Sequence, residues 1–146
     1  MIPHAGRVTT SAPWLQELDQ RECADLLRTG SVGRVVLTDR ALPVALPVNY
    51  AVDGDSVVFR TASLGTLSAA TGGSVVAFEV DELDLESREG WSVLVTGVMR
   101  EITSVSELLR VEQLRLESWG AAGPSARFVR VPFALLTGRS LRAQAV

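Results

Sequence analysis

The sequence predicts a mainly β fold, a small antiparallel barrel that carries a few helices. Six or seven short to medium runs rich in Val and other β-branched residues occupy most of the chain, and hairpin-length turns join most of them. The βαβ alternation of a doubly wound fold is missing, and so are its glycine-rich loop and the loop that binds nucleoside triphosphates. Closure into a barrel would also remove the exposed edges that so many Val-rich strands otherwise leave.

We expect residues 1–13 to form a loose arm and residues 14–146 to form a single domain. The arm is rich in Pro, Gly, Ser and Thr and has no periodicity. After it, Asp19 and Glu22 have the spacing of a capping box, which predicts a helix of about ten residues. Cys23 lies on the apolar stripe of this helix, so it is expected to fill the core rather than to act as a nucleophile.

The central prediction is a β-hairpin formed by residues 44–52 and 56–60. The sequence Asp-Gly-Asp at 53–55 separates these two apolar runs, and a Gly in an Asp-rich gap between β-branched runs is a strong hairpin signal. Pro43 and Pro47 restrict the first strand to places where a missing amide donor is tolerated, such as an edge or a bulge.

The rest of the chain is expected to add strands and one more clear helix. A first strand at residues 34–38 precedes the hairpin, and residues 64–71 suit a helical turn or two. Gly97 is expected to mark a bulge or a sharp bend in the longest strand. Further strands are predicted at 74–80, 91–102, 128–131 and 135–137, and a second helix at 104–116.

Composition and charge exclude several classes of function. The net charge is −3, which argues against nucleic acid or an anionic membrane as a partner. No apolar run approaches the roughly 18 residues of a membrane span, so we expect a cytoplasmic protein. All 14 basic residues are Arg, so an anion site must use Arg side chains, hydroxyls and backbone amides. Cys23 is the only cysteine and His4 the only histidine, which argues against a metal site and a Ser-His-Asp triad.

The end of the hairpin and the residues just after it carry hydrogen-bond donors that suit a phosphate. Arg60 and Thr61 end its second strand, and Thr66 and Ser68 come shortly afterwards, near Gly65. On the residues alone, Arg60 could simply be a solvated side chain, and that interpretation is the favoured one; hydroxyls are common wherever a strand gives way to a turn. Both interpretations stay open at this point.

Seven short motifs follow one another between about Trp14 and Leu141. They are L-x-x-x-E-C-x-x-L-L from Leu18, G-R-V-V-L from Gly33, L-P-V-N-Y from Leu46, V-V-F-R-T from Val57, V-A-F-E-V-D-E-L-D from Val76, G-W-S-V-L-V-T-G from Gly90 and L-L-T-G-R from Leu135. Each motif alone is weak. Together, in this order, they resemble the pyridoxamine 5′-phosphate oxidase-like family of flavin-binding split-barrel proteins, and in particular its short single-domain branch.

This resemblance implies a six-stranded antiparallel split barrel, a homodimer, and flavin mononucleotide (FMN) bound at the subunit interface. The strand that matches residues 46–50, with Val48 and Asn49, would run along the flavin ring. Arg60 and Thr61, at the end of the next strand, would hold the phosphate.

The link that follows the hairpin departs from the family pattern. Relatives carry a Thr-Lys pair that joins in phosphate binding; here Thr66 is present, but Leu67 stands where the lysine would be. Losing one charge-assisted hydrogen bond would weaken binding roughly ten- to hundred-fold without abolishing it. Arg139 or Arg34 could supply the missing cation.

Several other positions have two interpretations. Asn is disfavoured in a strand, so Asn49 either hydrogen-bonds to a flavin edge or pins a bulge. Trp91 belongs to the core or a dimer interface, or it stacks on the cofactor. Glu79 and Asp81 either pair with arginines or include a buried acid with a shifted pKa, and the ion pair is the favoured alternative.

The resemblance implies an FMN-dependent oxidoreductase that acts on a small molecule, in which the cofactor supplies the hydride chemistry. One alternative is a non-catalytic dimeric split barrel that binds a small ligand or none, and Leu67 is the best argument for it. Another is a deazaflavin-dependent reductase. A lysine-free chain of net charge −3 offers little support for that polyanionic cofactor.

Overall fold

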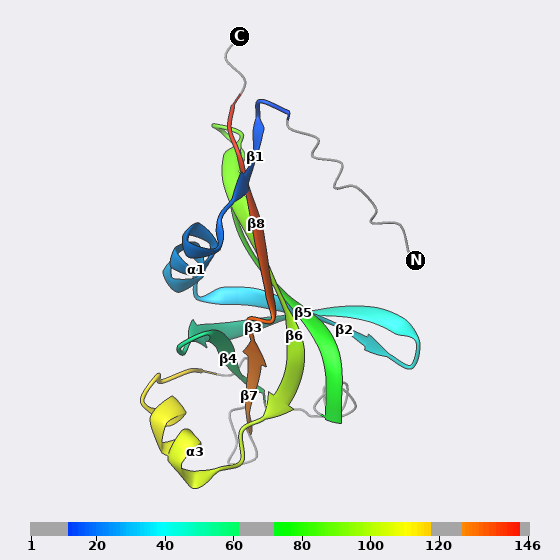
Figure 1. Ribbon diagram of the computed structural model, residues 1–146, viewed down its shortest axis with the longest axis vertical. Helices are drawn as coiled ribbons and strands as arrows, with labels where there is room; N and C mark the ends of the chain where they lie inside the picture. The colour runs from blue at the N-terminus through cyan, green and yellow to red at the C-terminus, as the bar shows by residue number, and fades with distance from the viewer. Residues whose placement is uncertain (1–11, 62–71, 118–126, 144–146) are drawn as a thin grey trace, which may run out of the picture.

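The computed structural model describes residues 12–61, 72–117 and 127–143, which form one strongly curved sheet and two helices (Figure 1). In chain order the elements are β1 (Leu15–Leu18), α1 (Gln20–Thr29), β2 (Val32–Asp39), β3 (Leu42–Val52), β4 (Ser56–Thr61), β5 (Gly72–Asp84), β6 (Glu89–Glu101), α3 (Val105–Glu112), β7 (Arg127–Pro132) and β8 (Leu135–Leu141). Within these ranges, neither helix is long and apolar enough to cross a membrane.

Six of the strands close into an antiparallel barrel. The hydrogen-bonded order is β1-β8-β6-β5-β2-β3-β4-β7, and β7 also pairs with β6. The ring therefore consists of β6, β5, β2, β3, β4 and β7, whereas β8 and β1 continue the sheet outside the ring. The six-stranded antiparallel barrel expected from the sequence is confirmed.

One edge of β6 is shared by two partners. The first half of the strand pairs with β8, and its last two residues pair with β7. Gly97 lies where the partner changes, and a Cβ atom there would overlap the carbonyl oxygen of Pro132. The pairing with β5 runs through Gly97 without a shift, and its irregularity lies instead between Gly72 and Val75. Gly97 therefore permits a close approach of two backbones and is not a bulge in the β5–β6 pair.

The predicted hairpin is present as β3 and β4. Tyr50 pairs with Phe59, and Gly54 in the turn has a φ angle of 58°, a conformation that glycine adopts without steric cost. Only the last three residues of β3 pair with β4, so the half that contains Pro43 and Pro47 has β2 on one edge and no described strand on the other. Both prolines therefore occupy places where a missing amide donor is tolerated, as expected.

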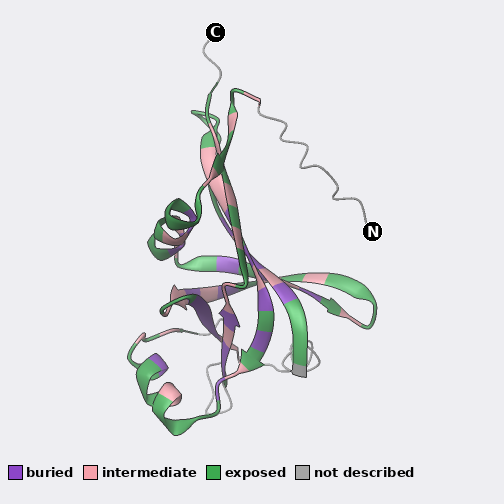
Figure 2. Ribbon diagram, in the orientation of Figure 1, coloured by how far each residue is buried: buried purple, intermediate pink, exposed green. Residues whose placement is uncertain are grey.

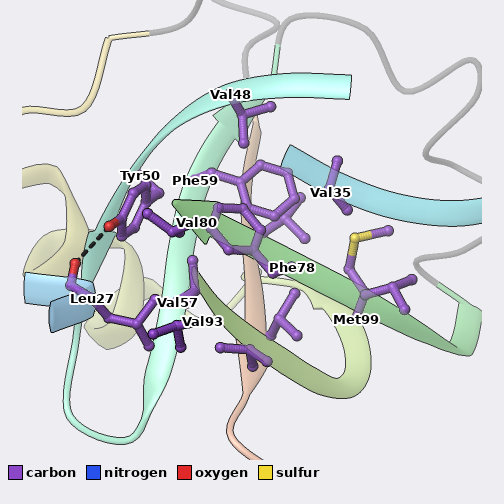
Figure 3. Packing of buried hydrophobic residues seen from close by; sticks show 14 of the residues in the cluster. Leu27, Val35, Val48, Tyr50, Val57, Phe59, Phe78, Val80, Val93 and Met99 are labelled. Carbon is purple, nitrogen blue, oxygen red and sulfur yellow. Dashed lines mark hydrogen bonds between the residues drawn. The ribbon is translucent and has the colours of Figure 1, made fainter. Parts of the chain in front are cut away.

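The first helix, α1, begins with the predicted capping box and is tied to the barrel at its other end. The Glu22 amide donates to Asp19 Oδ1 at 2.8 Å, and the Asp19 amide donates to Glu22 Oε2 at 3.0 Å. Cys23 and Leu27 are fully buried, which confirms Cys23 as a core residue. The Tyr50 hydroxyl donates a 2.6 Å hydrogen bond to the Leu27 carbonyl (Figure 3). Burial raises the pKa of Tyr50 to about 12, so this hydroxyl stays a neutral donor.

The main core fills the inside of the barrel (Figures 2 and 3). Phe78 packs edge-on against Tyr50, with ring centroids 5.2 Å apart, and stacks on Phe59 at 5.9 Å. Gly33 lies against Phe78, where a Cβ atom would overlap the ring. The other fully or almost fully buried side chains of this cluster include Val35, Val57, Val80, Val93, Val95, Met99, Val129 and Val131.

The helix α3 covers the outer face of β4 and β7 at the end of the barrel that lies lowest in Figure 1. Ser104 caps this helix by accepting a hydrogen bond from the Glu107 amide. The helix and the residues after it bury a second, smaller cluster on the outside of the barrel. Its members are Val58, Ile102, Val111 and Phe128, with Leu108, Leu114 and Leu116 packed against them.

One strand was not expected from the sequence, and the ends of others differ from those expected. Residues 15–18 were not expected to be a strand, yet they pair with β8, where Leu15 lies opposite Leu141. The last strand was expected to end at residue 137 and continues to Leu141. The expected arm, apart from its last two residues, and the expected helical turns at 64–71 lie outside the described residues.

Candidate functional site

Four of the predicted site residues gather where the pairing of β3 with β4 stops, in the middle of β3 and at the end of β4. Val48 and Asn49 come just before the first β3 residue that pairs with β4, and Arg60 and Thr61 are the last two residues of β4. The other edge of β4 pairs with β7 along its whole length. The candidate site is therefore built by three adjacent strands, and the two motifs that carry it are brought together by the hairpin.

The guanidinium of Arg60 lacks a carboxylate partner among the described residues. It lies over the ring of Phe128, with the guanidinium carbon 5.3 Å from the ring centroid, which is a cation–π arrangement. Its Nε is buried and has no hydrogen-bond partner within the described part of the chain. Because a buried unsatisfied N–H costs about 1–3 kcal/mol, a bound anion would supply the acceptor that Arg60 lacks. The residue fits a phosphate.

A second arginine, Arg127, lies near Arg60 but on the other face of the sheet. Thr61 is the cross-strand partner of Arg127, just as Arg60 is the partner of Phe128. Since paired residues project from the same face and successive residues from opposite faces, Thr61 and Arg127 share the face that Arg60 does not use. Arg127 Nη1 lies 3.0 Å from Glu101 Oε1.

Neither Phe128 nor Arg127 was found by sequence reasoning. Each lies opposite a predicted site residue only because β7 pairs with β4, and these strands are far apart in the sequence. Only the register of β4 against β7 identifies these two residues, and no local sequence pattern predicts that register.

The two predicted residues of β3 have different surroundings. The side chain of Val48 is buried in the main core, so any contact with a ligand along this strand would come from its backbone. Asn49 faces outward, and its Nδ2 donates a 3.2 Å hydrogen bond to the Glu117 carbonyl. The β2–β3 register reaches Asn49, its last pair, without a shift, so this residue does not pin a bulge in that pair of strands. Its amide holds the segment after α3 against β3, and its contact with a flavin stays a prediction.

Trp91 and Arg139 lie far from Arg60 within one subunit. Trp91 is near the start of β6, whose last residues reach β7 beside the site; at about 3.3 Å per residue the strand between them is roughly 30 Å long. Arg139 is exposed, pairs with Ser92, and borders an open groove of about 1480 Å³ between β1, β6 and β8. Trp91 is half-buried and packs against the main core. One subunit does not bring these two side chains to Arg60.

Thr66 and Ser68, the other two predicted phosphate ligands, lie outside the described residues, as does Leu67. Their roles stay predictions.

The expected ion pair on the outer face of the sheet is confirmed. Arg34 Nη1 lies 3.2 Å from Glu79 Oε2 and 3.8 Å from Asp81 Oδ2. Burial, together with the hydrogen bond and the charge of Asp81, raises the pKa of Glu79 above its ordinary value, although Arg34 opposes the shift.

A separate polar network lies beneath α3. Arg130 donates from Nη2 to Asp53 Oδ2 at 2.8 Å and from Nη1 to Ser56 Oγ, and its Nε lies 3.4 Å from Glu107 Oε2. Arg110 Nη2 donates to Asp53 Oδ1 at 2.7 Å. Burial alone would raise the pKa of Asp53, but hydrogen bonds from Arg130 and Arg110 hold it below its ordinary value. The charged groups of this network pair with one another, and the network fastens α3 to the barrel.

The described residues contain no group of three His, Cys, Asp or Glu side chains placed to hold a metal ion. His4 lies outside them.

Comparison with known proteins identifies the family. The family model described as pyridoxamine 5′-phosphate oxidase matches residues 19–140 of this chain. The chain belongs to the pyridoxamine 5′-phosphate oxidase family. The closed barrel of six antiparallel strands agrees with this assignment, and the resemblance inferred from the seven motifs is confirmed.

Similar proteins cover most of the chain. An uncharacterized protein of Mycobacterium tuberculosis is 41% identical over 125 residues, which are 82% of this chain and 82% of that protein. A structure described as the FAD binding protein from Mycobacterium smegmatis is 36% identical, covers 87% of this chain and 98% of that one, and superimposes with a TM-score of 0.72. A protein of unknown function from Corynebacterium diphtheriae is 29% identical, with coverages of 88% and 98% and a TM-score of 0.73.

Proposed function

We propose that this chain is a flavin-dependent oxidoreductase that works as a homodimer and holds the anionic tail of its flavin at Arg60 and Thr61. The observation that carries the proposal is the guanidinium of Arg60, which has a buried, unsatisfied Nε and no carboxylate partner among the described residues. Membership in the family supports it, as does the 36% identity to a protein named for FAD binding.

The homodimer is supported by the outer face of the sheet. Val75 and Val98 pair across β5 and β6, and Leu94 and Leu135 project from the same face. These four side chains are between 39% and 66% exposed. A group of large exposed apolar side chains on one face of a sheet is typical of an interaction surface, and we assign this one to the second subunit.

A dimer would also explain why the predicted site is divided. Trp91 and Arg139 lie at one end of β6 and Arg60 at the other, so two antiparallel copies could set the first end against the second. Trp91 and Arg139 of one subunit would then complete the site of the other, as the resemblance implies for a cofactor at the interface.

When bound, the flavin supplies the transfer of a hydride to or from a small-molecule substrate. The residues of the chain bind and orient it. Arg60 neutralises the charge of the phosphate, Thr61 follows it at the end of the same strand, and the backbone at Val48 and Asn49 forms the edge along which the ring would lie.

FMN is the flavin that the resemblance implies, and FAD is a second candidate. The relative from M. smegmatis favours FAD, and so does Leu67 in place of a lysine. The phosphate of FMN is a monoester whose second pKa is near 6, so it carries almost two charges at pH 7. The corresponding phosphate of FAD is a diester with one charge, for which a single arginine is a better match.

The deciding experiment is to purify the protein, record its visible absorption, and identify the released cofactor by mass spectrometry. We expect a yellow protein that releases FMN or FAD and elutes as a dimer. Arg60→Met should lose most of the flavin, whereas Arg28→Gln, at an exposed arginine of α1, should keep it.

A colourless protein that takes up neither FMN nor FAD would contradict the proposal and favour the non-catalytic barrel. Release of a deazaflavin would favour the reductase alternative. A monomer with full flavin occupancy would contradict the shared site while leaving the flavin assignment intact.

A further inference from the structure

The contact between Arg60 and Phe128 is the feature of the candidate site that no sequence motif assigns. The guanidinium carbon stands 5.3 Å from the ring centroid, and the two residues are cross-strand partners on β4 and β7. The ring stands against a planar cation that has a buried Nε without an acceptor and no carboxylate partner among the described residues. An arginine held in this way loses less rotational freedom when an anion arrives.

Phe128 is itself held firmly. It is 7% exposed and belongs to the small cluster beneath α3, together with Val58, Ile102 and Val111. The chain beyond it is fixed as well, because Arg130, two residues further along β7, is bound to Asp53. The ring is therefore a rigid support that can orient the half-buried side chain of Arg60.

We propose that Phe128 is a positioning residue for anion binding: its ring fixes the plane of the Arg60 guanidinium so that the hydrogen-bonding edge faces the phosphate of the cofactor. This inference rests on the proposed function for the identity of the anion. It assigns to Phe128 a role in selecting phosphorylated over unphosphorylated ligands, beyond its role in the apolar cluster.

The first test compares the affinities for FMN and for riboflavin, which lacks the phosphate. Phe128→Leu and Phe128→Met remove the ring and keep the apolar bulk, and Phe128→Tyr keeps the ring. We expect the Leu and Met variants to bind FMN about three- to ten-fold more weakly, with riboflavin affinity unchanged, because Arg60 would then have to be ordered when the phosphate binds. Phe128→Tyr should restore the FMN preference.

Val111→Ala is the matched control, because it disturbs the same cluster without touching Arg60. It should lower the melting temperature and leave the ratio of the two affinities unchanged. Equal losses of FMN and riboflavin binding in the Leu and Met variants, or an equal change of the ratio in Val111→Ala, would overturn the proposal and leave a purely structural role.

The second test needs no cofactor. NMR spectra of the free protein would be recorded for the arginine Nε–H signals, of which 14 are expected. The signal of Arg60 would be identified by its disappearance in Arg60→Met. We expect slow solvent exchange of this proton in the wild type and in Phe128→Tyr, and at least ten-fold faster exchange in Phe128→Leu.

The two proposals can fail separately. If the wild type binds no flavin, the proposed function fails, and the exchange rates alone decide whether Phe128 positions Arg60. If Arg60→Met loses the preference for FMN but the Leu and Met variants at 128 keep it, the flavin site stands and the role of Phe128 is overturned.

Discussion

Arg60 and Arg130 stand on adjacent strands, on the same covered face of the barrel, and have opposite surroundings. Arg130 has two carboxylates, Asp53 and Glu107, within 4 Å, and it is 11% exposed. Arg60 has an aromatic ring and no carboxylate among the residues that the structure describes. Both have a buried Nε without a hydrogen-bond partner there, so the difference lies in the charges that surround them.

The difference distinguishes an arginine that stabilises the fold from an arginine that is placed to bind a ligand. A buried cation whose charge is balanced by the chain's own carboxylates is already satisfied, and removing it leaves those carboxylates buried and unpaired. A cation that the chain leaves unbalanced contributes little to folding and is available to an external anion. Four substitutions test this contrast.

Arg130→Met should have the largest effect. Asp53 is 10% exposed and would lose its more deeply buried partner, so the free energy of unfolding should fall by about 3 kcal/mol. Urea denaturation measures this change. Arg110→Met, which removes the exposed partner of the same carboxylate, should cost about 1 kcal/mol or less. Equal costs for the two variants would mean that burial does not distinguish the pairs.

Asp53→Asn should have an intermediate effect that depends on pH. Because hydrogen bonds from Arg130 and Arg110 hold the pKa of Asp53 below its ordinary value, its ionised form stabilises the fold above the unfolded pKa of about 4. We expect the variant to be about 2 kcal/mol less stable at pH 7. The difference from the wild type should shrink as the pH falls below about 4, where the wild-type carboxylate becomes protonated. A difference that stays constant from pH 7 to pH 2 would contradict this account.

Arg60→Met should have the smallest effect on stability. Met replaces its methylene groups, and no ion pair with a described residue is lost. The loss of the cation–π contact opposes the gain from removing the unsatisfied Nε, so the free energy of unfolding of the cofactor-free protein should change by about 0.5 kcal/mol or less. The same variant should lose the preference for FMN over riboflavin. A large loss of stability without loss of that preference would mean that Arg60, like Arg130, stabilises the fold and does not bind the cofactor.

Local signals predicted the elements that depend on neighbouring residues. The capping box at Asp19, the Asp-Gly-Asp turn and the prolines of the hairpin all behave as their chemistry requires. The motifs around Val48 and Arg60 were also brought together, because a hairpin joins residues that are close in the sequence.

The rest of the site depends on contacts between distant strands. The position of α3 over β4 and β7, and with it the stacking of Phe128 on Arg60, follows from a pairing that no local pattern specifies. For the same reason, Trp91 and Arg139 were grouped with Arg60 by motif although β6 keeps them apart. The short strand β1 was missed because four residues carry too little alternation to be recognised.

The pairing of the first strand with the last has a consequence for biosynthesis. β8 lies between β1 and β6, so neither neighbour can complete its hydrogen bonds until Leu135–Leu141 have been synthesised. Until then the nascent chain carries the long edge of β6 uncovered, and an uncovered Val-rich edge is a template for aggregation. A translation product truncated before Leu135 would keep that hazard permanently.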